Sequence, residues 1–238
     1  MSPDLPPLLQ EIAYEREAQA YLKSLPLEHF MESTSQATQR KITWDSLGLL
    51  HLRRPEVRVF NELLVQYPLR GRRKLGQVVP DNMVVLTTER LRAVTSYNVP
   101  LEPARPFWVF EYVSKTNRRK DYEESFRKYK RELKVPYYLV FYPEAGEWTL
   151  YRHNKRKYVT VRPNEHDRCA IPELDLEVGL LDGWIRFWYR GELLLLPEDL
   201  QRNNEDLQRD NLELRQRLEA AERELARRRP NGRSSPAP

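Results

Sequence analysis

FWVFEYVS (107–114) and PYYLVFYPE (136–144) are the two stretches of sequence that decide the fold. Both are short and rich in aromatic and β-branched residues, which is typical of buried strands. The apolar residues between them recur at helical spacing and predict a helix from about residue 118 to residue 134. These residues are Tyr122, Phe126, Tyr129 and Leu133. A helix that crosses between two buried strands forms a βαβ unit, so we expect the strands to pair in parallel.

The flanking segments predict further strands. QVVPDNMVVL (77–86) has the pattern of a buried strand interrupted by Pro80, which lacks a backbone donor and therefore belongs at a strand edge or bend. EWTLYRHNKRKYVTVRP (147–163) predicts a hairpin with its turn at residues 153–157. VRVFNELLVQYPLR (57–70) is rich in β-branched and aromatic residues, but its start fits a helix equally well, so its type stays open.

The N-terminal residues have a helical pattern. Residues 4–52 include Leu8 and Ile12 at turn spacing, and a Ser/Thr/Gln-rich break at residues 33–39 divides the segment. We therefore expect two short helices. We assign residues 1–27 to an N-terminal helical extension and residues 28–197 to one α/β domain.

The composition indicates a globular protein of the reducing interior of the cell. At 238 residues the chain can hold one sizeable core. The lone Cys169 cannot form an intrachain disulfide. The N-terminus lacks a basic region followed by an apolar run, and no stretch approaches 18 uninterrupted apolar residues. We therefore expect a cytoplasmic protein that does not enter a membrane. GRRKLG (71–76) lacks the order of a phosphate-binding loop, and the histidines lack zinc-ligand spacing.

A strict heptad repeat begins at Leu200 and predicts a coiled coil over residues 198–229, followed by a disordered tail at residues 230–238. The a positions hold two asparagines and two leucines, and leucine dominates the d positions. The a positions are Asn204, Asn211, Leu218 and Leu225, and the d positions are Leu200, Leu207, Leu214 and Ala221.

Asparagine at two consecutive a positions favours two parallel strands, because paired amides can hydrogen-bond across a dimer seam. In a parallel dimer, Asp210 would face Arg215 and Arg217 would face Glu222, and both pairs attract. We therefore expect a homodimer formed through the coiled coil. The alternative is a single amphipathic helix that folds back on the domain, because the asparagines weaken a narrow seam.

Asp81 and Glu111 are the candidate catalytic and metal-binding residues. Glu111 lies inside an otherwise apolar strand, where burying a carboxylate is costly unless a cation or hydrogen bonds hold it. Asp81 follows Pro80 at the predicted bend. Two carboxylates on neighbouring strands repel each other when both are ionised, and a hard divalent cation such as Mg²⁺ relieves that repulsion. In the alternative interpretation, Glu111 pairs with an arginine and Asp81 caps a turn.

The order of these motifs resembles the Uma2 family, a branch of the PD-(D/E)xK nuclease-like fold. Pro80 and Asp81 come first, then Glu111 in a strand, then a basic helix, then YYLVFYPE (137–144), and the resemblance covers residues 28–180. It implies a restriction-endonuclease-like α/β fold, with a mixed sheet flanked by helices. It also implies a metal-dependent phosphodiesterase in which Asp81 and Glu111 bind Mg²⁺ or Mn²⁺ and the backbone carbonyl of Tyr112 is a third ligand.

The family pattern also requires a lysine that stabilises the charge developing on the phosphate. In the standard motif this lysine lies two residues after the acid, where this chain has Val113. Uma2 sequences often carry it on the following helix, four residues after an aspartate, and counted from Asp121 that position is Ser125. Lys128, about one turn further on, and Lys115, in or near the strand, are the two candidate replacements.

The basic segment points to DNA as the substrate. Residues 115–134 hold nine Lys or Arg and four Asp or Glu, which gives this segment the same net charge, +5, as the whole chain. The residues expected to bind DNA are Lys115, Arg118, Arg119, Lys120 and Arg127. A solvated helix with its apolar stripe buried is compatible with the same residues.

The resemblance further implies a glutamate from the first helix of the fold, for which Glu32 and Glu62 are the candidates. The predicted function is therefore a Mg²⁺-dependent DNA endonuclease that acts as a dimer. The alternative is a catalytically inactive nuclease fold that binds DNA or assembles with a partner recruited by the coiled coil. Val113 and Ser125, at the two positions where the lysine is expected, favour the alternative.

Overall fold

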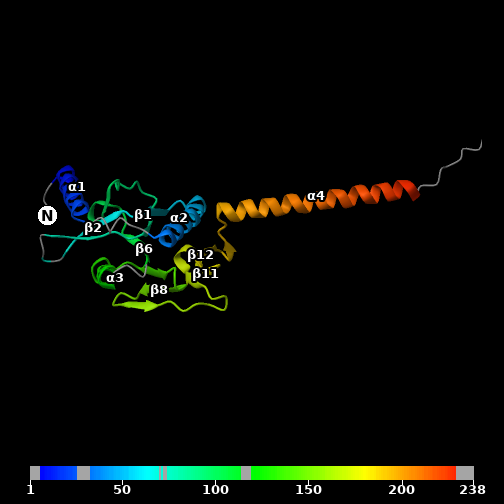
Figure 1. Ribbon diagram of the computed structural model, residues 1–238. Coiled ribbons are helices and arrows are strands. Elements are labelled where there is room, and N and C mark those ends of the chain that lie inside the picture. The colour runs from blue at the N-terminus through cyan, green and yellow to red at the C-terminus, as the bar shows by residue number, and fades with distance from the viewer. Residues whose placement is uncertain (1–5, 26–32, 70, 72–73, 114–118, 229–238) are drawn as a thin grey trace, which may run out of the picture. The chain divides into compact units, whose positions relative to one another are not determined.

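The computed structural model describes residues 6–25, 33–69, 71, 74–113 and 119–228, with the backbone alone at residues 119–122, 226 and 228. Two compact units make up the chain, residues 1–194 and residues 195–238. The first unit is a mixed α/β structure and the second contains one long helix (Figure 1).

A six-stranded mixed sheet forms the centre of the first unit, in the order β1-β4-β6-β7-β8-β9. Its strands are β1 (Val57–Asn61), β4 (Asn82–Leu86), β6 (Pro106–Tyr112), β7 (Tyr137–Tyr142), β8 (Glu147–His153) and β9 (Tyr158–Thr160). Strands β6 and β7 pair in parallel, with Glu111 opposite Val140. The chain crosses between them through α3 (Arg119–Arg127) and a π-helical turn, η3 (Lys128–Leu133). The predicted βαβ unit is therefore confirmed, as is the hairpin formed by β8 and β9.

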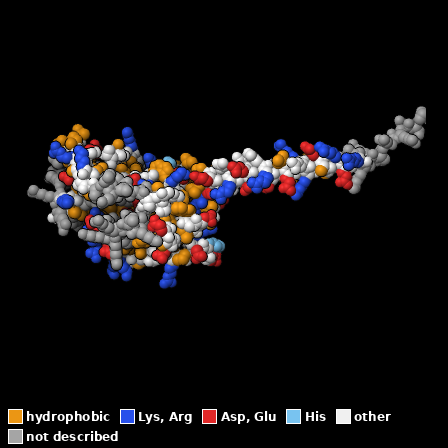
Figure 2. Space-filling view, in the orientation of Figure 1, with side chains coloured by type: hydrophobic (Ala, Val, Ile, Leu, Met, Phe, Trp, Pro, Cys, Tyr) orange, Lys and Arg blue, Asp and Glu red, His pale blue; other side chains and the backbone are white. Residues whose placement is uncertain are grey.

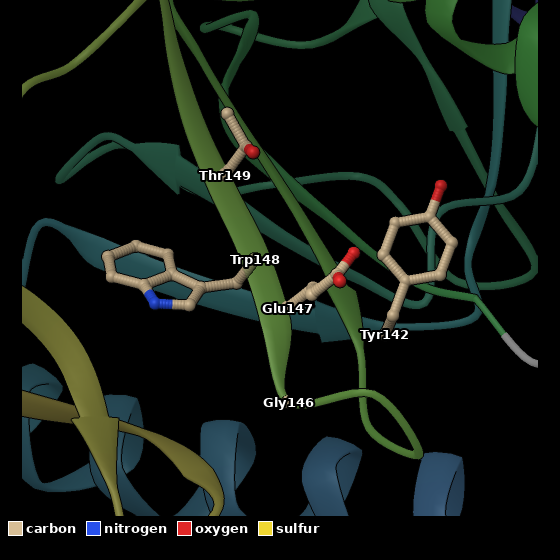
Figure 3. A pocket seen from close by; sticks show the side chains of 5 residues that line it. All are labelled: Tyr142, Gly146, Glu147, Trp148 and Thr149. Carbon is tan, nitrogen blue, oxygen red and sulfur yellow. The ribbon is translucent and has the colours of Figure 1, made fainter.

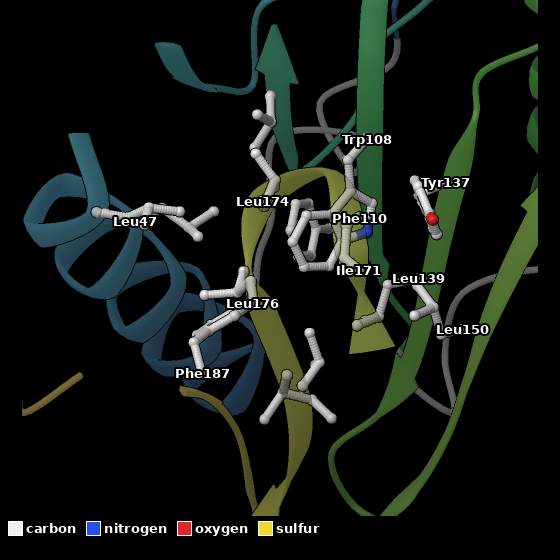
Figure 4. Close-up of a cluster of buried hydrophobic side chains, with 14 of the residues drawn as sticks. Leu47, Trp108, Phe110, Tyr137, Leu139, Leu150, Ile171, Leu174, Leu176 and Phe187 are labelled. Atoms are coloured by element: carbon white, nitrogen blue, oxygen red, sulfur yellow. The ribbon is translucent and has the colours of Figure 1, made fainter. Parts of the chain in front are cut away.

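Helix α2 (Thr34–Arg53) packs one face of this sheet. Its buried residues recur at spacings of three and four, so they form one face of the helix. Leu47 and Leu50 on this face join Trp108 and Phe110 of β6 in one apolar cluster. Figure 4 shows Leu47 directed at that cluster.

A second sheet contributes side chains to the same cluster and packs against helix α2. Its order is β10-β11-β12-β13, and all its pairs are antiparallel. The strands are β10 (Cys169–Ile171), β11 (Leu176–Leu181), β12 (Trp184–Tyr189) and β13 (Glu192–Leu193), with the short helix η4 (Pro172–Leu174) between β10 and β11. Leu176 and Phe187 point from this sheet into the core (Figure 4). No strand was predicted in this part of the chain from its sequence.

A three-stranded sheet, in the order β3-β2-β5, lies under the N-terminal helix. Its strands are β2 (Leu64–Pro68), β3 (Leu75–Val78) and β5 (Ser96–Asn98), and the short helix η2 (Val99–Leu101) follows. Helix α1 (Pro7–Ser24) buries Tyr14 and Ala18. Its backbone carbonyls at Tyr14 and Glu17 accept hydrogen bonds from Gln66 of β2 and Gln77 of β3. The middle of the N-terminal helix is therefore bound to the sheet.

Two local expectations are corrected by the structure, and one assignment that the sequence left open is decided. The Ser/Thr/Gln-rich segment at residues 33–39 is the beginning of α2, because the Ser33 and Gln36 side chains form a reciprocal capping box there. Residues 57–70, whose type the sequence left open, contain the two strands β1 and β2. Residues 77–86 divide around Pro80 into β3 and β4, which belong to different sheets, because proline cannot donate to a strand ladder.

Helix α4 (Pro197–Arg228) contains the predicted heptad repeat as one uninterrupted helix. The leucines of the predicted seam are exposed along it: Leu200, Leu207, Leu214, Leu218 and Leu225. Asn211 donates through its side-chain amide to the carbonyl of Leu207, 2.8 Å away, on the same helix. Charged side chains of both signs alternate along the helix (Figure 2). The pairing of this helix with a second copy remains a prediction.

Within the described ranges, no helix combines the length and the apolarity that crossing a membrane requires.

We predict that Leu47→Ala lowers the free energy of unfolding by about 2–5 kcal/mol, because the fully buried side chain leaves a cavity between α2 and the two sheets. Leu52→Ala is the matched control on the same helix. Its side chain is exposed, so a change within about 0.5 kcal/mol is expected. Urea unfolding followed by tryptophan fluorescence measures both, and equal losses would contradict this account of the core.

Candidate functional site

Asp81 and Glu111 meet at one end of the central sheet. Strand β4 begins there and the antiparallel strand β6 ends there, with Asn82 opposite Phe110. Asp81 directly precedes β4, and Glu111 follows Phe110 on β6. The Asp81 carboxylate (Oδ2) accepts a hydrogen bond of 2.6 Å from the backbone N–H of Tyr112. The two acids predicted from the sequence are therefore neighbours across two strands.

Glu111 lies on the opposite face of β6 from the large aromatic core. Side chains alternate along a strand, so Phe110 and Tyr112 face the cluster under α2, while Val109 and Val113 face the α3 side. Glu111 shares the second face, where the Tyr129 hydroxyl donates a hydrogen bond of 2.7 Å to its Oε1. Tyr129 lies in the π-helical turn η3, a geometry that is rare in helices and frequent at functional sites.

The pKa of the Glu111 carboxyl is raised well above its ordinary value. Burial is the largest cause, and the neighbouring Asp81 carboxylate is the second. The hydrogen bond from Tyr129 and the charge of Arg40 act in the opposite direction and only partly offset them. The ionised acid pair therefore carries excess negative charge that a bound cation would relieve.

Arg40 supplies a positive charge to this site from helix α2. Its guanidinium pairs with Asp81 at 3.1 Å and with Glu62 at 2.7 Å. Arg40 is 13% exposed and Asp81 19%, whereas Glu62 is 57% exposed. The arginine is thus buried at the acid pair, and its second partner reaches solvent.

A second residue of α2 contacts the same end of β6. Gln36, one turn before Arg40, donates its side-chain amide to the backbone carbonyl of Tyr112, which is the atom predicted as a third metal ligand. The Tyr112 hydroxyl donates to Asn82 Oδ1 at 2.7 Å and shares a hydrogen bond of 2.7 Å with Thr43. Polar contacts therefore fix both ends of Tyr112 against α2 and β4.

The candidate lysines and arginines lie in different places. Lys128 Nζ donates to the carbonyl of Gln77 at 2.8 Å and pairs with Glu124 at 2.9 Å, so its recorded contacts are with β3 and with its own helix. Arg127 pairs with Glu132 at 2.8 Å on the same helical segment. Lys115 and Arg118 lie outside the described residues, and Arg119 and Lys120 have only their backbone described, at the start of α3.

Of the two candidate glutamates, the structure describes only Glu62, and it does not lie on a helix. Glu62 lies in the turn between β1 and β2, with a positive φ of 45°. Its backbone N–H donates to the carbonyl of Asp81 at 3.2 Å. Glu32 lies outside the described residues. The helix that reaches the site is α2, and the side chains it contributes there are Gln36 and Arg40.

The chemistry of the acid pair fits a small divalent cation. Mg²⁺ is commonly held in proteins by one or two carboxylates, with water and substrate phosphate completing its six oxygen ligands. Asp81 and Glu111 supply two such carboxylates. No group of three or more His, Cys, Asp or Glu side chains suited to a metal ion occurs among the residues that the structure describes. A cation here would therefore depend on ligands that the side chains of this site do not supply.

Two surface hollows lie away from these acids. One, of about 430 Å³, lies at the turn between β7 and β8, where Tyr142, Glu147 and Trp148 line it (Figure 3). The other, of about 830 Å³, lies between α1 and residues 90–102. Neither includes Asp81 or Glu111 among its lining residues, so the candidate site is defined by its charges and hydrogen bonds.

Sequence reasoning missed Gln36, Arg40 and the hydrogen bond of Tyr129 to Glu111. Tyr129 was assigned to the buried stripe of its helix, which is correct, but the target of its hydroxyl is set by tertiary structure. A local signal existed for α2. Ser33 and Gln36 have the spacing of a capping box, which would have started the helix at the right place and put Gln36 and Arg40 on one flank.

A family model matches more than half of this chain. Residues 31–182 match the model of the Uma2 family, described as "Putative restriction endonuclease". A crystal structure from Anabaena variabilis ATCC 29413, titled as a putative nuclease belonging to DUF820, is similar over 60% of this chain and 75% of that chain. That similarity has 13% sequence identity and a TM-score of 0.46. No curated protein matches the chain.

The raised pKa of Glu111 predicts a pH-dependent effect of Glu111→Gln. Ordinary glutamate titrates near about pH 4.3, and the folded protein holds this proton to higher pH, so wild-type stability falls as the pH rises above that value. Glutamine carries no charge and avoids this loss. Without divalent metal, we expect the variant to gain on wild type between about pH 5 and about pH 8, by about 1.4 kcal/mol per unit of raised pKa.

Urea unfolding at both pH values measures this gain, and Glu173→Gln is the control. Burial opposes ionisation of Glu173, but contacts with Tyr137 and Arg152 outweigh it and lower the pKa of this carboxyl. The Glu173 carboxyl, with its lowered pKa, is therefore ionised at both pH values, and the effect of its substitution should be the same at both. A pH-independent difference for Glu111→Gln would contradict the raised pKa.

Proposed function

Because the chain belongs to the Uma2 family, we propose that it is a Mg²⁺-dependent DNA endonuclease that hydrolyses phosphodiester bonds as a dimer. The observation that carries this proposal is the acid pair, in which Asp81 and the partly buried Glu111 come together at one end of the central sheet. Keeping an acid ionised in an apolar strand is costly, and a metal ion bound by that acid would offset the cost.

Asp81 and Glu111 would hold the metal, with the Tyr112 carbonyl as a further oxygen donor. A bound Mg²⁺ supplies polarisation of the phosphate and a more acidic water. The protein keeps the two carboxylates in position through hydrogen bonds that do not require a metal. The Tyr112 N–H donates to Asp81, and the Tyr129 hydroxyl donates to Glu111. These donors orient the oxygens, so the site is organised by the fold itself.

The basic segment after β6 would bind the DNA backbone. Residues 115–134 carry a net charge of +5, and this segment joins Glu111 to β7. A cluster of cations beside an acid pair would draw phosphates toward the site and make the binding salt-dependent. Arg127 is a half-exposed cation of this segment in the described part of the helix.

Helix α4 would supply the dimer. Its leucines recur at the heptad positions on an unbroken helix, and a helix with exposed leucines on one seam buries them when it pairs. A dimer would present two sites, which suits the cutting of two DNA strands.

A second candidate function is DNA binding or partner assembly by an inactive nuclease fold. Val113 stands where the standard lysine is expected, and the contacts of Lys128 are with Gln77 and Glu124. A fold without a cation at the reacting phosphate would bind DNA without cutting it.

We predict that Asp81→Asn and Glu111→Gln each lower the rate of Mg²⁺- or Mn²⁺-stimulated DNA cleavage at least about 100-fold, a loss that mutating outer partners of metal ligands can already produce. Cleavage of a supercoiled plasmid measures the rate. Glu173→Gln removes a carboxylate from another ion pair, with Arg152, and should cut at the wild-type rate. Undiminished cutting by both site variants would refute the assignment, and wild-type protein that binds but never cuts would favour the second candidate.

We predict that the double variant Leu207→Glu, Leu214→Glu is a monomer, because it places charges at two d positions of the seam. Sedimentation velocity measures the mass. Leu212→Glu is the matched control on the same helix but outside the seam, and it should remain a dimer. The three leucines have similar exposures, 61%, 61% and 58%, so folding of a single chain should tolerate the changes equally. A dimer in the double variant would place dimerisation elsewhere in the chain.

A further inference from the structure

Arg40 is a cation placed at the acid pair from a part of the chain far from the nuclease motif. It comes from α2, whereas Asp81 and Glu111 come from β4 and β6 of the central sheet. The ion pair with Asp81 is largely buried, and the positive charge of Arg40 also acts on Glu111. A largely buried charge is costly unless an opposite charge pairs with it, and Asp81 provides that charge for Arg40.

Glu62 is the exchangeable partner of this arginine. Its pairing distance to Arg40 is 2.7 Å, but its side chain is 57% exposed. Ion pairs with such exposure contribute little to stability. The Asp81 contact is much less exposed and would keep the guanidinium in place if Glu62 left.

The backbone holds Glu62 at the site independently of its side chain. Glu62 has a positive φ of 45°, which non-glycine residues rarely adopt. Its N–H donates to the carbonyl of Asp81. The turn between β1 and β2 is therefore tied to the start of β4, and the carboxylate of Glu62 is delivered to Arg40 by this turn.

We propose that Arg40 binds a phosphate group of the nucleic acid, and that Glu62 occupies its guanidinium until the phosphate displaces it. A carboxylate and a phosphate present the same kind of oxygen acceptors to a guanidinium, so the Nη1 group that pairs with Glu62 could pair with either. Displacement costs little, because the departing carboxylate returns to water.

The family pattern requires a lysine that stabilises the charge on the phosphate, but this chain has Val113 and Ser125 at the two expected positions. Arg40 would supply that positive charge instead. Arginine remains charged in any protein environment, so burial does not remove its charge. The Lys128 ammonium contacts Gln77 and Glu124, whereas the Arg40 guanidinium contacts Asp81 directly. This inference deepens the proposed function and rests on it for catalysis, while its binding part can be measured separately.

The test measures the binding of a short DNA duplex by fluorescence anisotropy across a series of salt concentrations. Ca²⁺ is present to occupy the acid pair, and a gel checks that the duplex stays intact. Arg40→Met should weaken binding about tenfold and reduce the slope of log affinity against log salt by about 0.9, the loss of one phosphate contact. Glu62→Gln should tighten binding about two- to fivefold, because it removes the competing carboxylate.

Arg40→Lys and Arg168→Met are the controls. The lysine variant retains the charge and should recover most of the salt slope. Arg168 is a partly buried arginine paired with Glu177 beside the second sheet, and its loss should leave DNA binding unchanged. Urea midpoints of all variants show whether they are folded. Mn²⁺ binding followed by electron paramagnetic resonance should be unchanged in Glu62→Gln.

The outcomes separate this inference from the proposed function. An unchanged salt slope in Arg40→Met overturns the inference, as does weaker DNA or Mn²⁺ binding in Glu62→Gln, which would make Glu62 a ligand. If the wild-type protein does not cut DNA but the variants show the expected changes in binding, the nuclease proposal is wrong and Arg40 remains a phosphate-binding residue. Wild-type protein that cuts should lose at least about 100-fold in rate on Arg40→Met. Loss on Lys128→Met instead would assign the cation to Lys128.

Discussion

The repulsion between Glu111 and Asp81 is the constraint around which this end of the domain is built. Burial and the neighbouring carboxylate both oppose ionisation of Glu111, and they raise its pKa well above the ordinary value. Three contacts from different elements partly offset this repulsion. Tyr129 donates from the π-helical turn, Arg40 pairs from α2, and the N–H of Tyr112 donates to Asp81 from β6. Removing any of them leaves less compensation for two adjacent negative charges.

Helix α2 connects this site to the hydrophobic core. Its later turns bury Leu47 and Leu50 against the aromatic side chains of β6. Its first half is fixed to β12 by Gln39, whose amide donates to the carbonyl of Ile185 and accepts from its N–H. Its first turns carry Gln36 and Arg40 to the end of β6 and to Asp81. The packing that stabilises the domain therefore also sets the position of the arginine, because a helix anchored along one face moves as a rigid rod.

Much of the sheet could be predicted, because several of its strands are apolar runs that a few consecutive residues reveal. The apolar runs of β6 and β7 and the stripe that includes Tyr129 led to the βαβ unit, and the family resemblance led to Asp81 and Glu111. The errors arose where local pattern is ambiguous. Polar residues at 33–39 suggested a break, although a capping box began a helix there. Residues 164–194 carry short strands whose antiparallel pairing depends on partners in the same sheet.

The sequence by itself determined the βαβ unit, the two acids and the heptad spacing, since each depends on residues close together in the chain or on a recurring motif order. The tertiary structure decided what surrounds the acids. Arg40 lies 41 residues before Asp81, and Tyr129 lies 18 residues after Glu111. No periodicity links such residues. Their meeting follows from how α2 and η3 pack on the sheet, and packing of whole elements is what selects the partner of a buried charge.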